Sequence, residues 1–230
     1  MKRSLVTNLK ILSAAFLVLA AESSVNCQTT ATLVAGPAAE AGVEGVVDHL
    51  PANTILDALA MTAVGGNSGA MISQLMDKEA AELKASLKNV KVERVGEGIL
   101  ITLETKTIFE SDSYALASTK TLKEVAKALK KYKDTNALIE GHTDNTGEES
   151  YNQRLSENRA AEVENYFITQ GIADARMKVK GYGEKQPLAS NDTEIGKLTN
   201  RRLEIAIFAN DDMKARASKG DLGVFVASKK

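Results

Sequence analysis

The stretch that decides the fold is GHTDNTG, residues 141–147, followed after three residues by YNQRLSENR, residues 151–159. Ahead of it, the apolar run at residues 137–139 predicts a short buried strand. Behind it, apolar residues recur at helical spacing until Gly171, which predicts a helix of about five turns. The chain therefore leaves a strand, crosses a polar loop and enters a helix.

Arg159 sets this helix apart. Leu155, Arg159 and Val163 are spaced four residues apart, so they lie on one face of the predicted helix. The two apolar neighbours make that face the buried one, and a buried guanidinium without an acceptor is costly. Asp144, at the exit of the strand, is the nearest candidate acceptor in the chain. The two side chains either form a structural ion pair or are held apart to receive a ligand that carries the opposite two charges.

Three motifs resemble those of a known domain family. The first is Gly-His-Thr-Asp, a Thr-Gly loop and Asn-x-x-Leu-Ser-x-x-Arg-Ala, present at residues 141–144, 146–147 and 152–160. The second is Asn-Arg-Arg at residues 200–202, and the third is a Phe followed by Asp-Ser, at residues 109–113. On these motifs the sequence is similar to the peptidoglycan-associating domain of OmpA C-terminal regions, the Pal lipoprotein and MotB-type proteins.

The resemblance implies a ligand and its binding residues. In that family the aspartate binds the ammonium group, and the helical arginine binds the carboxylate, of the diaminopimelate side chain in Gram-negative peptidoglycan. By position these residues are Asp144 and Arg159, and a forked guanidinium suits a carboxylate. The resemblance implies secondary contacts from four further residues, the third through its backbone: Thr146, Asn152, Leu155 and Arg201.

The remaining pattern predicts an α/β fold. Residues 71–104 predict an amphipathic helix and then two alternating strands around the turn at residues 96–98. Residues 105–209, the expected OmpA-like domain, have the order β-α-β-α-β-β, with a polar loop at residues 187–192 before the last strand. We therefore expect a two-layer domain in which helices pack on one face of a mixed β-sheet.

Residues 1–27 resemble an export signal. Basic residues precede an apolar run at residues 11–21, which is too short to span a bilayer but suits a signal peptide. Cys27 is the only cysteine in the sequence, and we expect it to be the lipidated residue of a bacterial lipoprotein. The residues before it lack the usual leucine and small residue. Cleavage after Ala20 or Ala21, giving a soluble periplasmic protein, is therefore the alternative.

Two further segments carry no predicted chemistry. Residues 28–70 are rich in small residues and predict a flexible tether, with a small-residue helix at residues 54–64 as the alternative. Residues 210–230 are charged with few apolar anchors and predict a frayed C-terminal tail. Neither segment contributes to the predicted site.

The composition limits the function. The net charge is −1, and the sequence has no Trp and only 4% aromatic residues, so nucleic acid is not an expected partner. The two histidines, His49 and His142, are far apart in the sequence, and the single cysteine lies in the signal. We therefore expect no enzymatic activity, no metal and no cofactor. His142 is expected to be a satisfied strand-end histidine.

These features predict a non-catalytic protein that tethers the outer membrane to the cell wall. The expected partners are peptidoglycan, the outer membrane through a lipid anchor, and other envelope proteins, with the domain facing the periplasm. The alternatives are an envelope scaffold that acts mainly through protein partners, and a cell-wall hydrolase.

Overall fold

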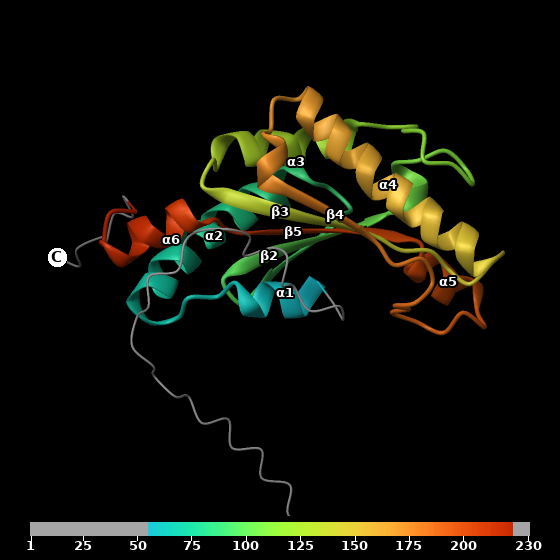
Figure 1. The fold of residues 1–230 in the computed structure, drawn as a ribbon, viewed down its shortest axis with the longest axis horizontal. Helices are drawn as coiled ribbons and strands as arrows, with labels where there is room; N and C mark the ends of the chain where they lie inside the picture. Colours follow the sequence, from blue (N-terminus) through green and yellow to red (C-terminus); the bar gives the residue numbers. More distant parts are fainter. Residues whose placement is uncertain (1–54, 223–230) are drawn as a thin grey trace, which may run out of the picture. The chain divides into compact units, whose positions relative to one another are not determined.

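The computed structural model describes residues 55–222 (Figure 1). The predicted signal, Cys27 and most of the predicted tether lie outside these residues, as do the last eight residues of the chain. The described residues all belong to one compact unit. None of the helices in the described part is both long and apolar enough to cross a membrane.

A mixed five-stranded sheet forms the centre of the domain, in the order β1-β2-β5-β3-β4. Strands β3 and β4 are parallel, and the other neighbouring pairs are antiparallel. The hairpin expected around residues 96–98 is confirmed as β1 and β2. The strands are β1 (Lys91–Val95), β2 (Gly98–Glu104), β3 (Thr135–Gly141), β4 (Met177–Gly181) and β5 (Arg202–Ala209).

Four helices share a hydrophobic core with one face of this sheet. They are α2 (Gly66–Ser86), α3 (Lys120–Lys131), α4 (Glu149–Thr169) and α6 (Asp211–Ser218). Alternate residues of the central strand β5, Leu203, Ile205 and Ile207, point into this core, because successive side chains of a strand face opposite sides. The expected α/β fold, with a mixed sheet and helices packed against it, is confirmed.

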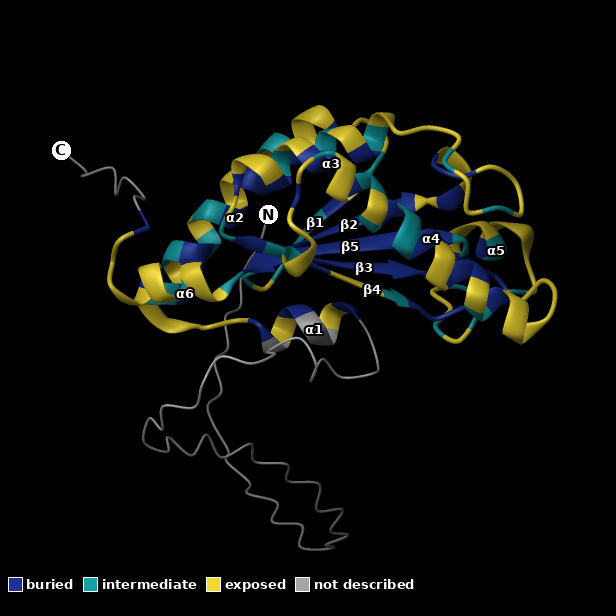
Figure 2. Ribbon diagram, turned by 45° about the horizontal axis from the view of Figure 1, so that its top comes forward, coloured by how far each residue is buried: buried dark blue, intermediate teal, exposed yellow. Residues whose placement is uncertain are grey.

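The opposite face of the sheet corrects two expectations. Helix α1 (Ile55–Met61) lies on the side away from α3 and α4 (Figures 1 and 2), so helices pack on both faces. Residues 55–61 form α1, which agrees with the helix given as the alternative for residues 54–64, and α2 begins at Gly66, so a tether that extends to residue 70 is wrong. The reason is that every residue of β5 is buried, so both faces need apolar cover. Ile55 and Leu59, one helical turn apart, supply it over Leu138 and Phe208.

Two more segments differ from expectation. Residues 211–218, expected in the frayed tail, form α6, because Met213, Ala217 and the following Leu222 are buried in the core. The Asn210 side chain accepts a hydrogen bond from the Met213 amide at 2.9 Å and begins the helix. The loop before β5 contains the short helix α5 (Glu194–Asn200), which is capped by the Thr193 side chain.

Candidate functional site

The candidate site lies where β3 ends and α4 begins. Strand β3 ends at Gly141, and a Cβ atom added there would clash with the backbone carbonyl of Ser156 on α4. A Cβ at Gly181, the paired end of β4, would clash with the backbone of Glu157. Glycine at both strand ends lets α4 lie against the sheet. This close packing brings the inward face of α4 over the loop that follows β3.

All six residues predicted for the site line one cavity of about 440 Å³. A cavity of this size can hold a small ligand or one side chain of a larger one. Its walls come from the loop after β3, from α4, from the chain around residues 105–112 and from the end of α5. The predicted residues on its walls are Asp144, Thr146, Asn152, Leu155, Arg159 and Arg201.

Asp144 is buried and holds two hydrogen-bond donors. Its Oδ1 accepts from the backbone amide of Thr146 at 2.8 Å, and its Oδ2 forms an ion pair with Arg201. Burial by itself raises the pKa of Asp144, but the hydrogen bonds from Thr146 and Arg201 outweigh that effect. Together they hold the pKa below its usual value. The carboxylate is therefore charged at neutral pH.

Arg159 is held by a different set of groups. Its Nε donates to the backbone carbonyl of Ser113 at 2.9 Å, and its guanidinium carbon lies 5.4 Å from the centroid of the Phe109 ring. Within residues 55–222, its two Nη groups have no hydrogen-bond acceptor. Burial lowers the pKa of Arg159, and the nearby Asp112 carboxylate partly offsets this. Of the two arrangements open from the sequence, the structure has Asp144 and Arg159 apart.

Asn152 fastens the loop to the helix. Its Nδ2 group donates to the carbonyls of Asp144 at 3.3 Å and Thr146 at 3.1 Å, and to Glu184 Oε2 at 2.6 Å. Asn152 is 2% exposed as a residue, whereas Thr146 is exposed at the rim. Asn152 thus holds the backbone at Asp144 in place, which is a positioning role in addition to its place on the cavity wall.

The loop at residues 109–113 was missed as part of the site. It carries the third motif of the sequence, but no site residue was predicted there. Phe109 and Asp112 line the cavity, and the Tyr151 hydroxyl on α4 donates to the Asp112 carbonyl at 3.2 Å. Asp112 has a positive φ of 48°, which is unusual for a residue with a side chain. The motif was the signal that could have identified this wall.

His142 faces away from the cavity. It is 1% exposed and stacks on Tyr182, with ring centroids 5.4 Å apart. Its Nε2 lies 3.8 Å from Glu140 Oε2 and 3.7 Å from Glu204 Oε2. Burial and the nearby Arg202 lower its pKa to about 3, so the ring is neutral.

Glu140, His142 and Glu204 are the acidic and histidine residues, within the described ranges, whose ligand atoms gather closely enough to suggest a cation. Burial, with the Glu204 carboxylate as the second cause, raises the pKa of Glu140 to about 7. The Arg202 guanidinium, however, donates to Glu204 at 2.9 Å and supplies positive charge to the group. Both ring nitrogens of His142 and the Oε2 of Glu140 are buried without a hydrogen-bond partner among the described residues, so the expectation of a satisfied histidine is wrong.

A larger hollow of about 1300 Å³ lies on the α1 side of the sheet. Ile55 and Leu56 of α1 and the exposed Leu188 and Ile195 are among the residues that line it. It contains none of the six predicted site residues. The smaller cavity at the β3–α4 junction is therefore the candidate site.

The sheet and this cavity define an α/β domain whose cavity has an aspartate on one wall and an arginine on another. A model of the OmpA family matches residues 108–201. The outer-membrane lipoprotein YfiB of Pseudomonas aeruginosa is 37% identical over 130 residues, which cover 56% of this chain and 77% of that protein. The chain belongs to the OmpA family.

Two further relatives match over a smaller share of their length. The probable lipoprotein YiaD of Escherichia coli is 38% identical over 143 residues, 60% of this chain and 65% of that protein, so the chain spans just under two thirds of it. The peptidoglycan-binding protein ArfA of Mycobacterium bovis is 42% identical over 86 residues, 37% of this chain and 26% of that protein.

Two solved structures are similar to the domain. A putative MotB-like protein from Desulfovibrio vulgaris has a TM-score of 0.54 at 21% identity, over 62% of this chain and 92% of that one, which supports the fold. The cell wall anchor of the T6SS from Pseudomonas aeruginosa has a TM-score of 0.50 at 31% identity, over 59% of this chain and 97% of that one.

Proposed function

We propose that this domain binds the diaminopimelate side chain of Gram-negative peptidoglycan without catalysing a reaction. Asp144 binds the ammonium group at the end of that side chain, and Arg159 binds the carboxylate. Thr146, Asn152, Leu155 and Arg201 surround these two contacts. The free end of diaminopimelate is a zwitterion, so a carboxylate and a guanidinium on separate walls match both of its charges.

The observation that carries this proposal is the state of Arg159. Arg159 is 6% exposed as a residue, and its two Nη groups have no protein acceptor within the described part of the chain, so they are free to donate to a ligand in the cavity. A ligand carboxylate would accept from those two groups. The contacts of Arg159 with Ser113 and Phe109 hold the guanidinium in place before a ligand arrives, which lowers the ordering cost of binding.

The relatives support the same class of ligand. One is named as a peptidoglycan-binding protein, another as a cell wall anchor, and two as lipoproteins. We infer that the chain is anchored in the outer membrane through a lipid on Cys27 and reaches the wall from the periplasmic side. Each peptide contact would be modest, but the wall is a polymer and the membrane confines many copies. The resulting effective concentration makes the attachment durable.

The test is co-sedimentation of the full chain with purified Gram-negative sacculi. We expect Asp144→Asn and Arg159→Gln to lose binding, since truncating one partner of a buried charged contact costs about 2–5 kcal/mol. Arg154→Gln is the matched control, because Arg154 is an exposed arginine on the same helix and is not among the residues that line the cavity. Thermal unfolding of each variant separates lost binding from lost folding.

Binding that survives in the folded Asp144→Asn and Arg159→Gln double variant would place the ligand elsewhere. Cross-links to envelope proteins that persist in this variant would favour the scaffold alternative. Soluble fragments released from labelled sacculi would favour the hydrolase alternative.

A further inference from the structure

The two halves of the site are not equally ready for a ligand. Arg159 has two Nη groups without an acceptor among the described residues, whereas both carboxylate oxygens of Asp144 are already engaged. Oδ1 accepts from the Thr146 amide and Oδ2 pairs with Arg201. An incoming ammonium group therefore meets an aspartate whose charge is already compensated.

Arg201 is built to let its side chain move while its backbone stays in place. Its amide donates to the Lys197 carbonyl at 2.9 Å, and its carbonyl accepts from the amide of Thr105 at 3.1 Å and from its hydroxyl at 3.2 Å. The side chain is 35% exposed, against 6% for that of Asp144. Arg201 can therefore leave the aspartate by rotating its side chain into the cavity.

The charge of the cavity decides what can displace Arg201. Three cationic and three anionic side chains line it, which sum to zero: Lys106, Arg159, Arg201, Glu110, Asp112 and Asp144. A ligand that brings only an amine adds one positive charge and leaves Arg201 without a partner beside Arg159. A zwitterion adds no net charge, and its carboxylate offers Arg201 a new acceptor. Such a difference is large in a partly buried site.

We propose that Arg201 is a specificity-determining counter-ion that keeps amines off Asp144 unless the same ligand also brings a carboxylate. Binding is then an exchange of ion pairs. The Asp144–Arg201 pair opens, the ligand ammonium takes the aspartate, and the ligand carboxylate takes Arg201 together with Arg159. This inference rests on the proposed function and adds the reason why the site would reject a ligand with one charge.

The experiment uses two stem peptides of the same shape, titrated into the full chain by calorimetry. One contains meso-diaminopimelate, and in the other the side-chain carboxylate of that residue is replaced by a carboxamide. We expect the wild type to bind the carboxamide at least tenfold more weakly. Arg201→Gln frees Asp144, so we expect it to bind the carboxamide about tenfold more tightly than the wild type does, a 1.4 kcal/mol change.

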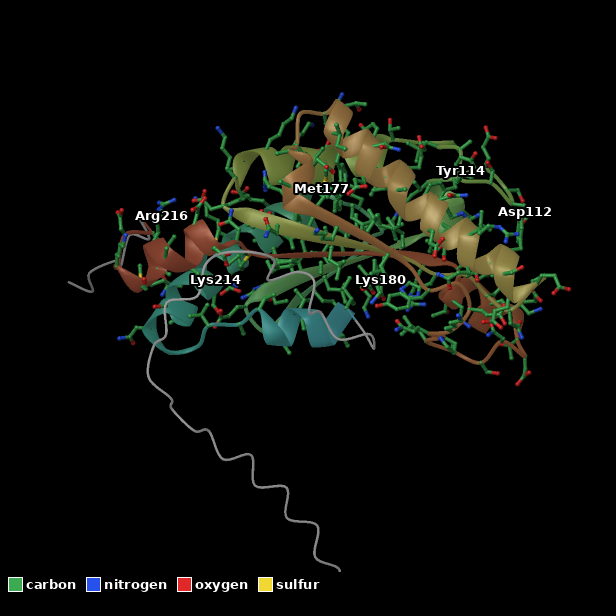
Figure 3. All side chains as sticks on the ribbon, viewed as in Figure 1. Asp112, Tyr114, Met177, Lys180, Lys214 and Arg216 are labelled. Atoms are coloured by element: carbon green, nitrogen blue, oxygen red, sulfur yellow. The ribbon has the colours of Figure 1, made fainter. Side chains whose placement is uncertain are left out.

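Two variants control for charge and for folding. Arg201→Lys retains a counter-ion and should restore the wild-type preference. Arg216→Gln removes an arginine from another ion pair, with Asp134. It lies at the opposite end of the domain from the cavity residue Asp112 (Figure 3), so this variant should bind both peptides like the wild type.

The outcomes separate this inference from the proposed function. If the wild type binds the diaminopimelate peptide, but Arg201→Gln binds the carboxamide no more tightly than the wild type does, Arg201 is an ordinary contact and only the inference fails. A wild type that binds neither peptide overturns both. Should Arg201→Gln not fold, side-chain NMR of the wild type decides: the diaminopimelate peptide should shift the Arg201 signal, and an unchanged signal overturns the exchange.

Discussion

Asp144 forms its ion pair with Arg201, 57 residues further along the chain, and not with Arg159, which faces the same cavity. The pairing engages the guanidinium of Arg201 and leaves the two Nη donor groups of Arg159 open to a ligand acceptor. It also keeps the aspartate ionised in an environment that would otherwise favour protonation. At the site, Asp144 is therefore ionised and already paired with Arg201, whereas Arg159 is available to bind an anion.

Binding of the diaminopimelate peptide should persist into mildly acidic solution. The pKa of Asp144 is held below its usual value, so its carboxylate stays ionised through the ordinary aspartate range. The charge that would bind the ligand ammonium is lost only as the pH falls through the folded-state pKa. We expect undiminished affinity at pH 5 and a decline only below about pH 4. Calorimetry across this range checks the expectation, and a midpoint above pH 5 would show that another group controls binding.

Glu79 should make the domain less stable as the pH rises toward 8. Both of its carboxylate oxygens are buried without a hydrogen-bond partner. Burial, partly offset by Arg176, raises its pKa from 4.5 to about 8. When the pKa of a carboxyl group is higher in the folded protein than in the unfolded chain, the free energy of unfolding falls as the pH rises from the unfolded-state pKa to the folded-state pKa. The full difference corresponds to roughly 5 kcal/mol.

The measurement is the melting temperature at pH 6 and pH 9. We expect the wild type to lose several degrees between these values and Glu79→Gln to lose much less. Glu82→Gln is the matched control, since Glu82 is on the same helix and pairs with Lys131 at the surface. An equal loss in the wild type and in Glu79→Gln would mean that Glu79 is already ionised in the folded protein.

Gly141→Ala should damage the fold and the site together. The added methyl group would clash with the Ser156 carbonyl, and overpacking of this kind costs about 1–3 kcal/mol. Because α4 must move away, Arg159 moves with it, and sacculus binding should fall more than in a variant of equal stability. Lys178→Ala, at an exposed position of β4, should retain both stability and binding. Unchanged stability in Gly141→Ala would show that α4 is not held by this contact.

Cys27→Ser should convert an anchored protein into a soluble one. We expect metabolic labelling with a palmitate analogue to mark the wild type and not the variant, because the thiol is the predicted acylation site. Fractionation should then move the variant from the membrane to the periplasm. Labelling of neither protein would favour the alternative of ordinary signal cleavage after Ala20 or Ala21, and labelling of both would show that a residue other than Cys27 carries the lipid.

The spacing of apolar residues was enough to predict the secondary structure at the centre of the domain. The strand, loop and helix at residues 137–169 follow from hydrophobic spacing and two glycines, and the buried face of α4 followed from Leu155 and Val163. The motifs also identified six residues that the structure brings to one cavity. Local periodicity did not predict α6, because Met213 and Ala217 are too few to give a pattern without the core that buries them. A helix at residues 54–64 was predicted only as the alternative, because the two apolar turns of α1 are similarly short.

The sequence by itself determined the α/β class, the strand–loop–helix at the centre, and the kinds of charge at the candidate site. Only the tertiary structure decided which charges meet. Asp144, Arg159 and Arg201 come from three separate elements, so their pairing depends on how α4 and the end of α5 pack around β3. Spacing along the chain specifies which face a side chain occupies. It does not specify the distance between side chains of different elements, because packing sets that distance.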